Sequence, residues 1–80
     1  NHRRYMEGHT WHTHSDTDEF FLVVSGSLTI RLPDDEVILA AGQVYVVPRG
    51  VRHQPLSSVG AHILLIEPSQ TVNTGDRPAR

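Results

Sequence analysis

Three side chains that commonly bind metal ions, those of His12, His14 and Glu19, lie within eight residues of one another. Successive side chains of an extended strand point to opposite faces. His12 and His14 would therefore share one face, about 6 to 7 Å apart along the strand. Two such imidazoles can reach one divalent ion at bond lengths of about 2.0 to 2.1 Å. A carboxylate from the next strand would add a third ligand, so the spacing predicts a metal site with nitrogen and oxygen ligands.

Two further features favour a metal at this place over scattered surface histidines. Glu19 immediately precedes the apolar run 20–24, where an uncompensated carboxylate would cost several kcal/mol, and a metal ion would remove that cost. His53 follows the turn residue Gly50 by three positions, so a neighbouring strand could bring it to the same cavity. We assign the remaining histidines to the surface or the edge of the core: His2, His9 and His62.

The elements that must position these side chains are short strands. Apolar and β-branched residues gather in short runs separated by Gly, Pro, Asp and Ser. No stretch predicts a helix of three turns, and turn signals recur about every eight residues, so we expect an all-β sandwich or barrel. The expected strands are 9–14, 19–24, 27–32, 36–40, 43–47, 53–56 and 61–67.

Several details of these strands follow from their patterns. The continuous apolar run 20–24 indicates burial on both faces, and Ser25-Gly26 predicts a turn that joins 19–24 and 27–32 in a hairpin. The turn at Pro48-Arg49-Gly50 favours a positive φ at its glycine. We expect six apolar strand residues to divide between the interior and a packing face: Phe21, Val23, Val44, Val46, Leu64 and Ile66.

Composition excludes several classes of function. A net charge of -2 and seven scattered arginines argue against a nucleic-acid partner, and no apolar run is long enough to span a membrane. The chain has no lysine for Schiff-base chemistry and no cysteine for disulfides or zinc ribbons. A chain without cysteine suits a reducing cytoplasm, where we expect this protein.

The length of 80 residues predicts one domain over 1–80, with a core at about 8–67 and an extended tail at 68–80. A domain of this size is marginal alone and gains stability from a metal or from oligomerisation. We therefore expect a homodimer, formed by sheet extension or by packing of sheet faces.

In its histidine, glutamate, glycine and proline spacings the chain resembles a known family, the cupins. The first cupin motif is glycine, a spacer, His-x-His, three or four residues, glutamate, six residues and glycine. The chain matches it with His12, His14, Glu19 and Gly26. Only the leading glycine differs from the motif: Gly8 lies two residues closer to His12 than the motif requires.

The second cupin motif is glycine, five residues, proline, one residue, glycine, two residues, histidine, three residues and asparagine. The chain matches it with Gly42, Pro48, Gly50 and His53, and Ser57 stands at the asparagine position. The short spacer between the motifs and the closing segment 64–75 are similar to small single-domain cupins of the phosphomannose isomerase-like (cupin 2 conserved barrel) group.

The resemblance implies a double-stranded β-helix, the jelly-roll barrel of the cupins, with one divalent metal ion inside one mouth. It implies that the ion is held by His12, His14, Glu19 and His53. These ligands admit iron, manganese, nickel, zinc or copper, and they leave positions for a small-molecule ligand.

Three functions stay open for such a site. The first is a metal-dependent enzyme, an oxygenase or an isomerase acting on a small polar metabolite, with Glu19 as the catalytic residue that takes a proton. The second is a non-catalytic binding module, and the third is a barrel with a purely structural metal. Arg49 and Arg52 could hold a substrate carboxylate or phosphate, or could be solvated turn residues.

Overall fold

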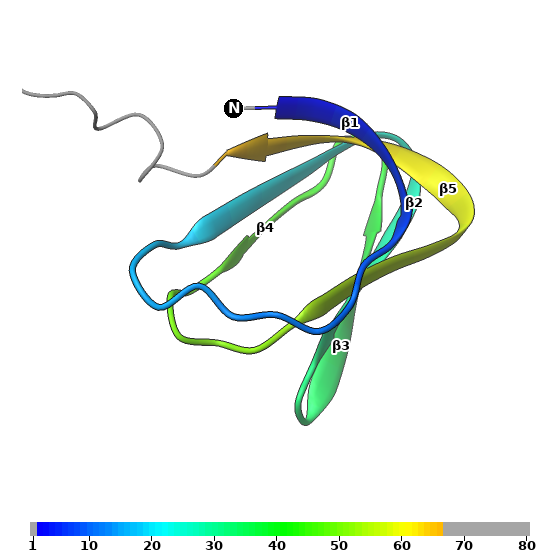
Figure 1. Ribbon diagram of the computed structural model, residues 1–80. Helices are drawn as coiled ribbons and strands as arrows, with labels where there is room; N and C mark the ends of the chain where they lie inside the picture. Colours follow the sequence, from blue (N-terminus) through cyan, green and yellow to red (C-terminus); the bar gives the residue numbers. More distant parts are fainter. Residues whose placement is uncertain (1, 67–80) are drawn as a thin grey trace, which may run out of the picture.

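The computed structural model describes residues 2–66 as one antiparallel sheet of five strands curled around an apolar core (Figure 1). The described residues contain no helix, so none of their elements is a helix able to cross a membrane. The prediction of an all-β chain without a long helix is confirmed. The strands are β1 (His2–Gly8), β2 (Glu19–Leu32), β3 (Asp35–Ala40), β4 (Val44–Val47) and β5 (Gln54–Ile66).

The long strand β2 organises the sheet, whose order is β1-β5-β2-β3, with β4 also paired to β2. Residues 19–22 of β2 pair with β4, and residues 27–32 pair with β3. Strand β5 runs along the opposite edge of β2, and β1 pairs with β5. Glu19, the first residue of β2, pairs with Val47 of β4. The strands expected at 36–40 and 43–47 are confirmed as β3 and β4.

The prediction of a hairpin at Ser25-Gly26 is wrong, because both residues lie within the continuous strand β2. Its pairing with β5 shifts register between Val23 and Ser25 and again between Gly26 and Thr29. A β-bulge inserts residues without reversing the chain, and a glycine with positive φ suits a bulge as well as a turn. Gly26 has a φ of 88°, which explains why the sequence signal was ambiguous.

Strand β5 corrects a second prediction, since the two strands expected at 53–56 and 61–67 are replaced over the described residues by one strand, Gln54–Ile66. Gly60 interrupts its apolar pattern but has a φ of 85° and stays within the strand. The third correction concerns 9–14, which is no strand: within it only His12 forms an isolated β-bridge, to His53. Residue 67 and the predicted tail at 68–80 lie outside the described residues.

The buried side chains of β2 alternate, so its apolar run is not buried on both faces. Phe21 and Val23 point into the core, whereas Phe20 and Leu22 are half-buried and Val24 is exposed. The expected division of apolar residues holds: Val44 and Val46 are exposed, while Leu64 and Ile66 are half-buried. The buried core consists of Met6, Phe21, Val23, Leu28, Ile30, Leu39, Val47, Ala61, Ile63 and Leu65.

Candidate metal centre

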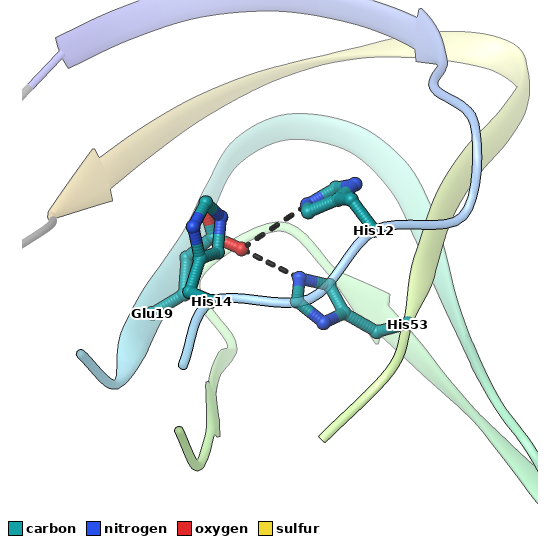
Figure 2. A group of neighbouring side chains, drawn as sticks. All are labelled: His12, His14, Glu19 and His53. Atoms are coloured by element: carbon teal, nitrogen blue, oxygen red, sulfur yellow. Dashed lines mark hydrogen bonds and ion pairs between the residues drawn. The ribbon is translucent and has the colours of Figure 1, made fainter. Parts of the chain in front are cut away.

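Four side chains from three separate segments converge at one end of the curled sheet (Figure 2). His12 and His14 come from the connection between β1 and β2, Glu19 begins β2, and His53 immediately precedes β5. One potential ligand atom from each residue lies within 4.8 Å of all the others. The structure therefore brings together the whole set that the sequence singled out.

Backbone hydrogen bonds, rather than a strand, hold the two-histidine segment in place. Residues 9–14 run antiparallel to residues 50–55. His12 and His53 exchange two N–H···O bonds of 2.9 and 3.0 Å, and the Gly50 N–H donates to the His14 carbonyl at 2.7 Å. The His9 N–H donates to the Pro55 carbonyl at 3.0 Å. This ladder explains how His12 and His14 reach one centre although the strand expected to position them does not form.

The turn at 48–50 contacts both the two-histidine segment and the residue before Glu19. The Val51 N–H donates to the Pro48 carbonyl, and Gly50 has a φ of 81°, which confirms the expected positive φ. The N–H of Arg49 donates to Asp18 Oδ1 at 2.9 Å, which lowers the pKa of the Asp18 carboxyl. Asp18 precedes Glu19, so this bond fixes the start of β2 against the turn.

Glu19 is the centre of the cluster, and its side chain is only 4% exposed. Oε1 of Glu19 lies 2.6 Å from Nε2 of His53 and 3.6 Å from Nε2 of His12, the two dashed lines of Figure 2. Oε2 lies 3.3 Å from Nε2 of His14. A buried carboxylate requires such charge-assisted partners or a cation.

Two of the imidazoles are oriented by hydrogen bonds on their far side. Nδ1 of His12 lies 3.0 Å from the Thr10 carbonyl, and Nδ1 of His53 lies 2.8 Å from the Val51 carbonyl. Because a carbonyl only accepts, both Nδ1 atoms carry the proton. This tautomer leaves Nε2 free to bind a metal, and metal-binding histidines commonly donate their other ring N–H to a carbonyl or carboxylate in this way.

His53 is the most buried of the three histidines, with 1% of its side chain exposed. Burial lowers the pKa of His53, but the hydrogen bonds to Glu19 and to the Val51 carbonyl and the charge of Glu19 together raise it above its ordinary value of 6.5. In the absence of a metal, these contacts therefore favour the protonated form of the His53 imidazole.

The donor set fits a first-row divalent transition metal. Ligand atoms at about 2.1 Å from an octahedral ion lie about 3 Å apart when adjacent and about 4.2 Å apart when opposite. The Glu19–histidine separations of 2.6 to 3.6 Å, and the 4.8 Å within which all four ligand atoms lie, approach this range. The donor types and their convergence are therefore consistent with one ion.

A cavity of about 330 Å³ opens beside the cluster. Its described lining includes the ligand candidates His12, His14 and Glu19 together with side chains that sequence reasoning did not assign to a site. His9 was assigned to the surface, and although exposed it also lines the cavity. No motif marks the others, because they are ordinary strand and loop residues: Met6, Thr10, Phe21, Pro55 and Leu65.

The two arginines considered for substrate binding contact other groups. Nε of Arg49 lies 3.3 Å from Asp18 Oδ1 in an exposed ion pair. The guanidinium carbon of Arg52 lies 4.5 Å from the ring centroid of Trp11. Neither side chain is among the described residues that line the cavity.

Comparisons with known proteins agree with this geometry. Residues 4–67 match the family model described as "Cupin domain". The chain is 38% identical over 61 residues to the uncharacterized protein YdbB of Bacillus subtilis. That match covers 75% of this chain but 54% of YdbB, so the chain spans about half the length of this curated relative.

Two solved structures share both sequence and fold with the chain. A cupin-2 domain containing protein from Shewanella frigidimarina is 39% identical with a TM-score of 0.77, over 79% of this chain and 63% of that protein. Protein NMB1881 from Neisseria meningitidis is 31% identical with a TM-score of 0.78, over 82% of this chain and 69% of its own. The likeness to the Shewanella structure identifies the curled antiparallel sheet as the cupin fold, as the sequence resemblance implied.

Proposed function

This chain belongs to the cupin domain family, and from that premise we propose that it is a metal-dependent enzyme acting on a small polar metabolite. One divalent transition-metal ion is held by His12, His14, Glu19 and His53. The observation that carries the proposal is the convergence of three imidazole Nε2 atoms and a buried carboxylate beside an open cavity.

The bound ion supplies Lewis acidity and a template for a ligand that chelates through oxygen atoms. Other residues of the chain orient the histidine ligand atoms for such an ion. Thr10 and Val51 fix the tautomers of His12 and His53. The side chains of His12 and His14 are 31% and 38% exposed, so this side of the centre is accessible to a ligand.

Glu19 is the catalytic candidate because it is the carboxylate at the centre of the cluster and lines the cavity. Its Oε1 lies 2.6 Å from Nε2 of His53. A carboxylate that loosens from its partners can accept a proton from a ligand held in the cavity. This role suits both an oxygenase and an isomerase.

A binding module without turnover is the second candidate. It is favoured by the shortage of other acid-base groups: among the described lining residues outside the four ligand candidates, His9 is the one titratable side chain. A purely structural metal is less well supported, because structural sites are closed, whereas the cavity opens directly beside these ligands.

Metal analysis tests the shared premise of these candidates. Protein purified without chelators should contain about one transition-metal ion per chain, and His14→Ala should lose it. His62→Ala is the matched control, because His62 is exposed and its Nδ1 contacts Ser25 Oγ outside the cluster. Unchanged metal content in His14→Ala would refute the site.

Turnover then separates enzyme from binding module. Iron-dependent oxygen uptake with diketone or catechol compounds would support the oxygenase, and interconversion of a hydroxy-carbonyl compound would support the isomerase. Compounds that raise the melting temperature of the loaded protein but are never converted would favour the binding module.

A further inference from the structure

We propose that the small metabolite bound here has a polar chelating end and a compact apolar body, and that the cavity selects it in preference to a ligand that carries a phosphate. The proposal rests on the proposed function, because it assumes that the chelating end of the ligand meets a metal at the histidine and glutamate cluster. It adds the chemical class of the remainder of the molecule.

The wall of the cavity beyond the cluster is apolar. Phe21, Met6 and Leu65 are 1%, 4% and 4% exposed and belong to the buried core as well as to the cavity lining. They come from the adjacent strands β2, β1 and β5, and Phe21 is the direct cross-strand partner of Leu65. Pro55 adds a further apolar surface.

Such a wall favours some ligands over others according to the polarity of the part that does not bind the metal. An apolar group that leaves water for this surface gains about 25 cal/mol for each Å² that it buries. A phosphate or a row of hydroxyls would lose hydration there without finding partners on these side chains, which is unfavourable. The cavity volume of about 330 Å³ lies at the small end of the range for ligand sites, which favours a compact molecule.

The polar groups around the cavity agree with this choice. His9 and Thr10 are exposed and line the cavity, where they can hydrogen-bond a carbonyl or hydroxyl at the open end. Arginine is the residue that most often binds phosphate in a forked geometry. The guanidinium of Arg49 faces Asp18, and those of Arg31 and Arg52 lie 6.0 and 4.5 Å from the Trp11 ring centroid.

Three hydroxamates with one chelating head and different bodies test the proposal: acetohydroxamate, benzohydroxamate and phosphonoacetohydroxamate. Each is titrated into the full chain loaded with one equivalent of Co²⁺, and the visible absorption of the cobalt reports binding without any turnover. We expect benzohydroxamate to bind at least tenfold more tightly than acetohydroxamate, and phosphonoacetohydroxamate to bind most weakly.

The outcomes separate this inference from the proposed function. Tightest binding by phosphonoacetohydroxamate, or no preference for the phenyl body, overturns the inference while leaving the metal site intact. No spectral response to any of the three compounds overturns the proposed function, and the inference with it.

Two variants test whether the apolar wall of the cavity causes the preference for benzohydroxamate. Leu65→Ala should reduce the preference for benzohydroxamate over acetohydroxamate severalfold, whereas Leu64→Ala, at a half-buried residue outside the described lining, should preserve it. An unchanged preference in folded Leu65→Ala overturns the assignment of the wall. If that variant does not fold, the three titrations of the unmodified chain still decide the question.

Discussion

Glu19 Oε1 lies 2.6 Å from His53 Nε2, although 34 residues separate the two in sequence, and both side chains are almost completely buried. The contact joins the first motif of the family to the second. Without a metal, a protonated His53 can donate from Nε2 to the buried carboxylate across this contact. A metal ion must replace this proton, so the same contact both prepares the site and competes with the ion.

Replacing the central carboxylate should therefore weaken metal binding strongly. Glu19→Gln removes the charge and one ligand atom while keeping the size of the side chain. Loss of an outer-shell partner alone lowers metal affinity by about 10- to 100-fold, so we expect a loss of at least about 100-fold in a chelator-competition titration. Glu7→Gln, at an exposed residue of β1, is the control and should bind like the parent. Equal affinities in both variants would remove Glu19 from the ligand set.

The raised pKa of His53 predicts how the stability of the metal-free protein depends on pH. A group whose pKa is higher in the folded state stabilises that state fully below its unfolded pKa, here 6.5. The contribution is lost as pH rises through the higher folded pKa. After chelator treatment, the free energy of unfolding of the parent relative to His53→Gln should therefore fall as the pH rises above about 6.5. Urea unfolding measures this difference, and a difference that grows with pH would contradict the sign of the shift.

The clustering of His12, His14, Glu19 and His53 could be predicted from sequence because its signal is local and chemical. Histidine, histidine and glutamate at fixed spacings, followed by a Gly-Pro-Gly-His pattern, identify residues irrespective of the backbone that carries them. The strand expected at 9–14 does not form, yet His12 and His14 reach the site through bonds to residues 50–55.

The strand boundaries could not be predicted because glycine signals are ambiguous. Gly26 and Gly60 have positive φ angles, and either could mark a turn, but in the structure they face each other across β2 and β5. Whether such a glycine forms a bulge or a turn depends on the pairing of the neighbouring strand, here between β2 and β5. The apolar cavity wall was missed for a similar reason: the run 64–66 is apolar throughout, so its inward residue, Leu65, depends on register.

The facing glycines yield a prediction with a matched control. Gly26 and Gly42 have similar φ angles of 88° and 86°, so alanine strains the backbone equally at either position, by about 1 to 2 kcal/mol. A Cβ at Gly26 would also collide with the carbonyl oxygen of Gly60, whereas a Cβ at Gly42 meets no atom within 4 Å. Gly26→Ala should therefore lower the free energy of unfolding by at least about 1 kcal/mol more than Gly42→Ala. Equal losses in urea unfolding would show that the close approach is unimportant.

The outer face of the sheet carries two cross-strand rows of apolar side chains, which lead to a prediction about assembly. Val46 and Ile66 are the partners of Phe20 on its two sides, and Val44 and Leu64 flank Leu22 in the same way. Val44 and Val46 are 46% and 43% exposed, and a contiguous apolar face of this kind commonly marks a protein interface.

We expect a second copy of the chain to cover this face, because closed symmetric dimers join identical surfaces. Light scattering should then give twice the chain mass of 9.0 kDa for the parent. Val46→Glu places a charge in one of the rows and should yield a particle of 9.0 kDa. Val59→Glu adds the same charge at a valine that is 71% exposed and outside both rows, so it should leave the dimer intact. A parent particle of single-chain mass, or loss of the dimer in Val59→Glu alone, would refute this assignment of the face.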